Sequence, residues 1–133
     1  MSNRIPESYR DLLRDDVKTF AFLATTMPDG SPQVTPLWFD FDGEIVCVNT
    51  ARGRTKDRNM AARPKVALAI MDPSNPYRYV QIRGTVVESR EQGAEEHIRR
   101  LSQKYRGTAE FAIPSGQIRV TLRIRPDRVS AQG

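Results

Sequence analysis

Residues 46–72 read VCVNTARGRTKDRNMAARPKVALAIMD, and this stretch decides the fold class. Its first part belongs to a predicted strand, Glu44–Thr50, that is rich in β-branched residues. A Gly-containing turn follows, and Gly53–Arg63 predicts a three-turn helix that Pro64 ends. Lys65–Asp72 is nearly continuous in apolar residues and predicts a strand that is buried on most sides. A short helix between two strands indicates a mostly β protein.

Two more strands are predicted before this stretch. Lys18–Met27 is rich in aromatic and β-branched residues, and a Pro-Asp-Gly-Ser turn separates it from Gln33–Phe41. Pro36 has no N–H to donate, so we expect its strand to lie at a sheet edge or beside a ligand. Asp42-Gly43 then predicts a hairpin turn. We expect these three strands to form an antiparallel meander.

The remaining elements complete a barrel. They are two helices, Pro6–Asp16 (short and amphipathic) and Glu91–Arg106, and three strands, Tyr77–Ser89, Ile118–Arg125 and the short closing strand Asp127–Ser130. Gly84 predicts a bulge or bend, and alternation in the Ile118–Arg125 strand predicts a basic outer face. A sheet of six or seven strands avoids exposed edges most simply by closing. We therefore expect one mostly β (α+β) domain, residues 1–133, with three short helices.

The composition argues against several classes of function. The 133 residues are 38% hydrophobic and 28% charged, with no apolar run near the roughly 20 residues that span a bilayer and no signal peptide. We expect a soluble, cytoplasmic protein without a membrane partner. Cys47 and His97 are the only residues of their types, which argues against zinc clusters and catalytic triads. We expect Cys47 to be a small buried residue and His97 to lie on a solvated helix face.

The net charge of +5 is concentrated in Thr50–Lys65. A cation in the first turn of a helix opposes the helix dipole unless an anion binds there too. The stretch therefore predicts a phosphate site, with solvated surface charge as the alternative. Its basic residues are Arg52, Arg54, Lys56, Arg58, Arg63 and Lys65, against the single acid Asp57.

Aromatic residues leave two readings open. Trp38 lies next to Pro36 and either stacks on a flat heterocycle or, with Phe39, belongs to the core or a dimer interface. Tyr77 and Tyr79 flank Arg78, a pattern that also occurs in nucleic-acid-binding proteins. No RNP-like or helix-turn-helix pattern accompanies it, so we expect no nucleic-acid partner.

The segments FAFLATTMPDGSPQVTPLWFDFDG, VCVNTARGRTKDRNMAARPKVALAIMD, YVQIRGTVVE and VTLRIRPDRV together resemble a known family. It is that of the pyridoxamine 5′-phosphate oxidase-like, FMN-binding split β-barrel flavoproteins, and within it the deazaflavin (coenzyme F420)-dependent oxidoreductases. The resemblance implies a homodimer with the cofactor in a groove between two barrels. True pyridoxamine phosphate oxidases complete their substrate site with a C-terminal segment for which this chain is too short, so we do not expect oxidation of pyridoxamine phosphate. The basic, Arg-containing loop and the short length more closely resemble the F420 branch, with FMN as the alternative.

The resemblance also implies roles for particular residues. Lys56 and Arg54 would hold the cofactor phosphate with the Thr50 hydroxyl, and Asn59 would cap or brace the basic helix. The cofactor ring would lie along the strand that holds Thr35, Pro36, Leu37 and Trp38. A segment from the same or the neighbouring subunit, Tyr77, Arg78 and Tyr79, would close over it.

These roles imply an oxidoreductase that transfers hydride from reduced F420 to a small conjugated or heteroaromatic substrate. The cofactor supplies the reactive atom, so no catalytic triad or metal is needed. An FMN enzyme of the same fold and a flavin or F420 carrier without turnover remain alternatives. The proton donor would be solvent or a tyrosine such as Tyr79.

Overall fold

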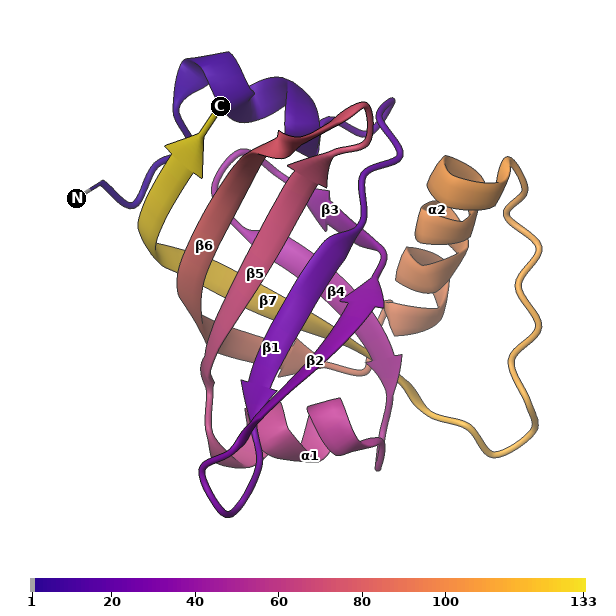
Figure 1. Cartoon of the computed structure of the whole chain (residues 1–133). Coiled ribbons are helices and arrows are strands. Elements are labelled where there is room, and N and C mark those ends of the chain that lie inside the picture. The colour runs from indigo at the N-terminus through magenta and orange to yellow at the C-terminus, as the bar shows by residue number, and fades with distance from the viewer. Residues whose placement is uncertain (1) are drawn as a thin grey trace.

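The computed structural model describes residues 2–133, whose strands form one seven-stranded antiparallel sheet curled into a split barrel (Figure 1). The sheet order is β2-β1-β5-β6-β7-β4-β3, and this confirms the mostly β split-barrel prediction. The strands are β1 (Ala21–Thr26), β2 (Pro32–Leu37), β3 (Phe39–Phe41), β4 (Val46–Ala51), β5 (Lys65–Asp72), β6 (Asn75–Arg90) and β7 (Arg119–Gln132).

The predicted meander is wrong. β2 pairs with β1 and β3 pairs with β4, but β2 and β3 lie at opposite ends of the sheet order. The predicted strand Gln33–Phe41 is therefore two edge strands, and the chain passes from one to the other at Trp38. Alternating apolar residues indicate which face of a strand is buried, but they do not indicate its neighbour. The edge position predicted for Pro36 is confirmed, since β2 pairs on one side only.

The core lies inside the curl of the sheet, where one face of each strand meets the others. Leu23, Leu68, Ile82 and Val129 stand opposite one another in consecutive registers across four strands, and all are buried. The outer face of β5 is only partly covered, so the prediction that this strand is buried on most sides is wrong for that face. The small side chains of Ala67 and Ala69 make this face apolar but leave it half-buried.

A bulge between Arg83 and Gly84 lets β6 and β7 bend around the barrel, and this confirms the prediction for Gly84. A Cβ on Gly84 would lie 2.6 Å from the carbonyl oxygen of Arg125, so only glycine fits without displacement. Pro126 stands opposite Gly84 within β7. β7 therefore continues through this proline, and Asp127–Ser130 is not a separate strand.

Three helices accompany the sheet within residues 2–133: η1 (Glu7–Leu13), α1 (Thr55–Ala62) and α2 (Ala94–Arg106). The first is a 3-10 helix, shorter than the amphipathic helix predicted for Pro6–Asp16. α2 buries its predicted apolar stripe against the outer face of β4 and β7. No helix in the described part of the chain is long and apolar enough to cross a membrane.

Candidate functional site

The carboxylate of Asp57 closes the turn between β4 and α1. Asp57, in the first turn of α1, accepts hydrogen bonds from the backbone N–H of Gly53 (2.9 Å) and from Nη1 of Arg52 (3.1 Å). Gly53 has a φ of +89°, in the left-handed region that favours glycine. Arg52 also pairs with Glu91 (2.8 Å). The single carboxylate of the basic stretch thus serves the turn and leaves the other cations of the stretch unmatched.

Two of these unmatched cations, Arg54 and Lys56, form with Arg119 of β7 what we call the cation cluster. Arg119 begins β7 directly opposite Ala51, the last residue of β4, so it stands beside the turn. Within residues 2–133, no carboxylate lies within 4.0 Å of any of the three. Burial lowers the pKa of the Lys56 ammonium, and the charges of Arg54 and Arg119 lower it further. Uncompensated positive charge of this kind favours an anion.

The sequence did not identify Arg119 as a site residue. Its position in the alternating strand predicted an exposed basic face, but Arg119 is only 5% exposed. Burial and the charge of Arg54 lower the pKa of its guanidinium. A buried arginine becomes evident only when the neighbouring strand and helix are in place.

Two hydroxyl groups provide a test of whether a ligand fits here. Oγ1 of Thr50 and Oγ1 of Thr35 are buried and have no hydrogen-bond partner among residues 2–133. An unpartnered buried hydroxyl costs about 1–3 kcal/mol, so such groups usually mark a missing partner. Thr50 is the residue before the last of β4, directly ahead of the basic turn, and Thr35 lies in edge strand β2. Both fit the cofactor-binding roles that the resemblance implies.

Asn59 braces the basic helix. Its side chain is buried in α1, and Nδ2 donates to Oγ1 of Thr25 in β1 (3.0 Å). Oδ1 of the same amide accepts a hydrogen bond from Arg63 (3.1 Å). The contact with Thr25 ties α1 to β1.

Trp38 is held against α2 rather than left open. Its ring stacks on Tyr105 with centroids 5.4 Å apart and an interplanar angle of 4°, and Phe111 meets it edge-on at 6.2 Å. Trp38 remains half-buried, whereas its neighbour Phe39 is fully buried in the core. In β2, Leu37 is half-buried and Pro36 exposed. The strand therefore keeps partly open positions next to a rigid aromatic wall.

The segment Tyr77–Tyr79 lies near the β5–β6 hairpin, at the opposite end of the sheet from α1 (Figure 1). Arg78 pairs with Asp11 (2.6 Å) and Asp72 (3.1 Å), which ties the hairpin to η1. Tyr77 is 80% exposed, and the Tyr79 hydroxyl donates to Gln132. Within one subunit this segment is not brought together with the cation cluster.

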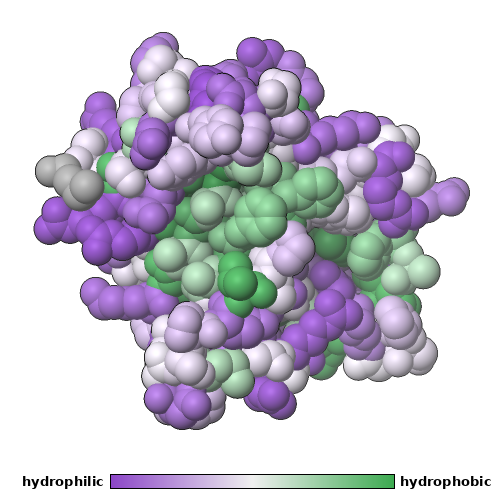
Figure 2. All heavy atoms as spheres, in the orientation of Figure 1, coloured by the Kyte–Doolittle hydropathy of each residue, from purple (hydrophilic) through white to green (hydrophobic). Residues whose placement is uncertain are grey.

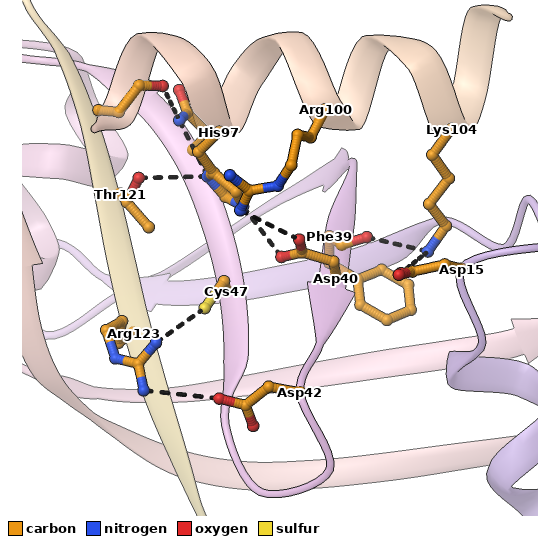
Figure 3. Close-up of polar contacts among 12 residues, drawn as sticks. Asp15, Phe39, Asp40, Asp42, Cys47, His97, Arg100, Lys104, Thr121 and Arg123 are labelled. Atoms are coloured by element: carbon orange, nitrogen blue, oxygen red, sulfur yellow. Dashed lines mark hydrogen bonds and ion pairs between the residues drawn. The ribbon is translucent and has the colours of Figure 1, made fainter.

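His97 is buried, so its predicted place on a solvated helix face is wrong. Figure 3 shows it pointing from α2 toward the sheet, between Asp40 of β3 and Thr121 of β7. Nε2 lies 2.9 Å from Asp40 Oδ1, and Nδ1 lies 3.2 Å from Thr121 Oγ1 and 3.1 Å from Asn49 Nδ2. The helical pattern flanks His97 with charged residues, but α2 sits close enough to the sheet to bury more than its apolar stripe.

Cys47 lies near this histidine and is half-buried, less buried than the sequence predicted (Figure 3). Burial, with the nearby charge of Asp40, raises the pKa of its thiol to about 11. Nη1 of Arg123 is 3.6 Å from the sulfur. The thiol is therefore protonated near neutral pH and is a poor nucleophile.

An apolar patch covers the outer face of β1, β2 and β5, visible at the centre of Figure 2. The strand registers place Phe22 beside Pro36 and Ala69, and Ala24 beside Val34 and Ala67. Val34 is 63% exposed and Phe22 39% exposed. Contiguous exposed apolar groups of this kind mark interaction surfaces.

Comparison with known proteins finds relatives of the same fold. The sequence model described as pyridoxamine 5′-phosphate oxidase matches residues 5–133. A solved structure titled F420 reductase shares 36% sequence identity and a TM-score of 0.84, covering 95% of this chain and 98% of that one. No curated protein matches the sequence.

More distant structures share the fold alone. A conserved hypothetical protein of Mycobacterium tuberculosis has 21% identity and a TM-score of 0.72, covering 99% of this chain and 88% of its own. The HupZ protein of Group A Streptococcus has 19% identity and a TM-score of 0.70, covering 96% and 93%.

Proposed function

The chain belongs to the pyridoxamine 5′-phosphate oxidase family, and from that premise we propose that it is an oxidoreductase dependent on coenzyme F420. The proposed reaction is hydride transfer from the reduced deazaflavin to a small conjugated or heteroaromatic substrate. The same fold with FMN is the second candidate, because the family as a whole is one of flavin-binding proteins.

The cation cluster is the observation that carries this proposal. Arg54 and Lys56 have no carboxylate partner within residues 2–133, and the Thr50 hydroxyl beside their turn has no hydrogen-bond partner. A phosphate would supply acceptors for all three groups at once. We assign Lys56, Arg54 and Thr50 to the cofactor phosphate, with Arg58 as an exposed bystander on the same helix.

The ring of the cofactor is assigned to the β2 edge. Thr35 there has an unpartnered hydroxyl, and the Trp38–Tyr105 stack gives a rigid wall next to it. When bound, the cofactor supplies the hydride, so the protein is asked only to bind, orient and exclude water. The only thiol of the chain, Cys47, is protonated near neutral pH, so the protein offers no thiolate nucleophile of its own.

The preference for F420 over FMN rests on the relative with 36% identity, which is matched over nearly its whole length. Net charge points the same way, because +5 suits a cofactor that carries several acidic groups. A carrier without turnover would show the same binding site. Reduced cofactor and a panel of conjugated substrates distinguish an enzyme from a carrier, since only the enzyme reoxidises the cofactor when substrate is added.

We also propose that the protein is a homodimer through the apolar patch on β1, β2 and β5. Val34 and Phe22 would otherwise expose apolar surface to water. In a two-fold dimer the same patch of each subunit packs against its copy, so both patches would be buried. The segment Tyr77–Tyr79 is far from the cation cluster of its own subunit (Figure 1). If it contacts the cofactor, it does so in the partner's site.

A binding titration tests the proposal. F420, FMN and riboflavin are added separately to the protein, and the quenching of the single tryptophan, Trp38, is followed. We expect Lys56→Ala to weaken binding of the phosphorylated cofactor about 10- to 100-fold, as befits a lost charge-assisted hydrogen bond. Arg58→Ala, on the same helix, should change it less than about threefold. Equal affinity of Lys56→Ala and wild type contradicts the phosphate assignment.

A further inference from the structure

Arg119 is the most deeply buried member of the cation cluster, and all its partners are neutral. Nε donates to Oδ1 of Asn49 (3.0 Å), Nη1 donates to Oε1 of Gln117 (3.1 Å), and the guanidinium lies 5.5 Å from the centre of the Phe111 ring. Nη2 donates to no residue between 2 and 133. Burying a charge without a counter-ion is costly, and a bound anion would offset that cost.

Asn49 holds this guanidinium in one orientation. Its Oδ1 must face Arg119, because Nε of arginine is always a donor. Its Nδ2 then faces the carbonyl oxygen of Ala94 (2.9 Å), which is always an acceptor, and Nδ1 of His97 (3.1 Å). The second hydrogen of the amide is then directed at Nδ1 of His97, which satisfies it as an acceptor, and the Thr121 hydroxyl, 3.2 Å from the same nitrogen, can donate to it as well.

This arrangement favours one tautomer of His97. With Nδ1 accepting, the proton is on Nε2, which donates to Oδ1 of Asp40 over 2.9 Å (Figure 3). His97 is only 3% exposed, so water does not compete for either nitrogen. Hydrogen bonds thus connect Asp40 to His97, His97 to Asn49, and Asn49 to Arg119, through side chains from β3, α2, β4 and β7.

We propose that Arg119 binds the phosphate of the cofactor and that His97 is a positioning residue, which holds Arg119 in place through Asn49. The inference rests on the proposed phosphate site and adds to it a residue from β7 and its support. His97 itself touches no ligand. It acts by giving the Asn49 amide a second acceptor beside the Ala94 carbonyl, which strengthens the orientation in which Oδ1 faces the guanidinium.

A purely structural His97 would make a different prediction. It would join α2 to the sheet, and its loss would lower stability and weaken every ligand equally. A positioning role instead affects the phosphate alone. The two are separated by comparing the phosphorylated cofactor with its phosphate-free chromophore, such as FMN with riboflavin or F420 with its deazaflavin riboside.

Two substitutions at His97 each keep one of its two contacts, the one with Asn49 or the one with Asp40. In His97→Asn, the amide oxygen can take the place of Nδ1 and accept from Asn49. In His97→Gln, the amide nitrogen can take the place of Nε2 and donate to Asp40, but the acceptor for Asn49 is lost. Both remove the imidazole from the same position, so each is a matched control for the other.

The measurement is the ratio of the affinities for the phosphorylated and phosphate-free forms, using whichever of F420 or FMN the wild type binds more tightly. We expect Arg119→Gln to lower the ratio about tenfold or more, and His97→Gln about threefold, while His97→Asn stays within about twofold. Urea unfolding of each variant identifies the conditions in which it is folded. Arg119→Lys, which keeps the charge, should fall between wild type and Arg119→Gln.

The outcomes separate the two proposals. A wild-type ratio near one, or no binding of either cofactor, overturns the proposed phosphate site and this inference with it. A wild-type preference for the phosphorylated form that Arg119→Gln leaves unchanged overturns the inference alone. Equal ratios in His97→Gln and His97→Asn overturn the positioning role of His97 and leave Arg119 as the binding residue.

Discussion

The rings of Trp38 and Tyr105 stack almost in parallel, at 4° and 5.4 Å between centroids. The stack joins the crossing between β2 and β3 to α2, which comes much later in the chain. The Tyr105 hydroxyl donates to the carbonyl of Thr19 and accepts the N–H of Phe39 (3.4 Å). One side chain of α2 thus joins the segment before β1 to the start of edge strand β3.

Tyr105→Phe should keep the stack and lose the hydroxyl contacts. Because the backbone groups of Thr19 and Phe39 then lack this partner in a buried place, we expect the free energy of unfolding to fall by about 1–3 kcal/mol. Urea unfolding measures the loss, and the Trp38 emission maximum of the folded protein should not change. Tyr105→Leu removes the stack as well and should shift the emission. A Tyr105→Phe variant as stable as wild type would show that the hydroxyl contacts contribute nothing.

Gly84→Ala should destabilise the barrel at its bend. The new methyl group would meet the carbonyl oxygen of Arg125 at 2.6 Å and Cγ2 of Ile124 at 2.8 Å, so the two long strands must separate. We expect a loss of about 1–3 kcal/mol, typical of overpacking. The neighbouring exposed residue supplies the control, since Arg83→Ala should stay within about 0.5 kcal/mol. Equal unfolding midpoints of the two variants would contradict the steric argument.

Val34→Glu should dissociate the proposed homodimer. A carboxylate in the middle of an apolar interface would be buried without a partner, and dimerisation should weaken at least tenfold. Sedimentation measured over a range of protein concentrations reports this change. Val87→Glu is the matched control, because Val87 is also exposed but lies in β6 beyond the part paired with β5. A monomeric wild type, or a dimer that Val34→Glu leaves intact, would place the interface elsewhere or exclude it.

Cys47 should react slowly with thiol reagents at neutral pH. Burial raises the pKa of its thiol from 9.0 to about 11, and only the thiolate reacts. The rate should rise about tenfold per pH unit from pH 7 to 10, and at pH 8 it should be about 100-fold below that of the unfolded chain. Iodoacetamide labelling followed by mass spectrometry gives both numbers. A rate that levels off below pH 9 would mean that the folded thiol is not shielded as the structure indicates.

Local patterns predicted most of the secondary structure. β5 has the bounds that were predicted, Lys65–Asp72. Its apolar run lies between Pro64 and Pro73, and these two prolines mark its ends. The apolar stripe of α2 is also as predicted, since a 3.6-residue period identifies the buried face of a helix directly. The basic turn at Arg54 and Lys56 was found the same way, from neighbours in the chain. Its proposed role in phosphate binding remains a prediction.

What the sequence determined by itself is therefore most of the elements, the family and the basic turn, because each depends on local patterns or linear motifs. Only the tertiary structure decided that β2 and β3 lie at opposite ends of the sheet, because pairing depends on contacts between distant segments. It also decided that Arg119 and His97 are buried, and that Asn49 joins them. Whether a polar side chain faces water or a partner depends on what packs over it, and α2 packs over β4 and β7 only in the folded chain.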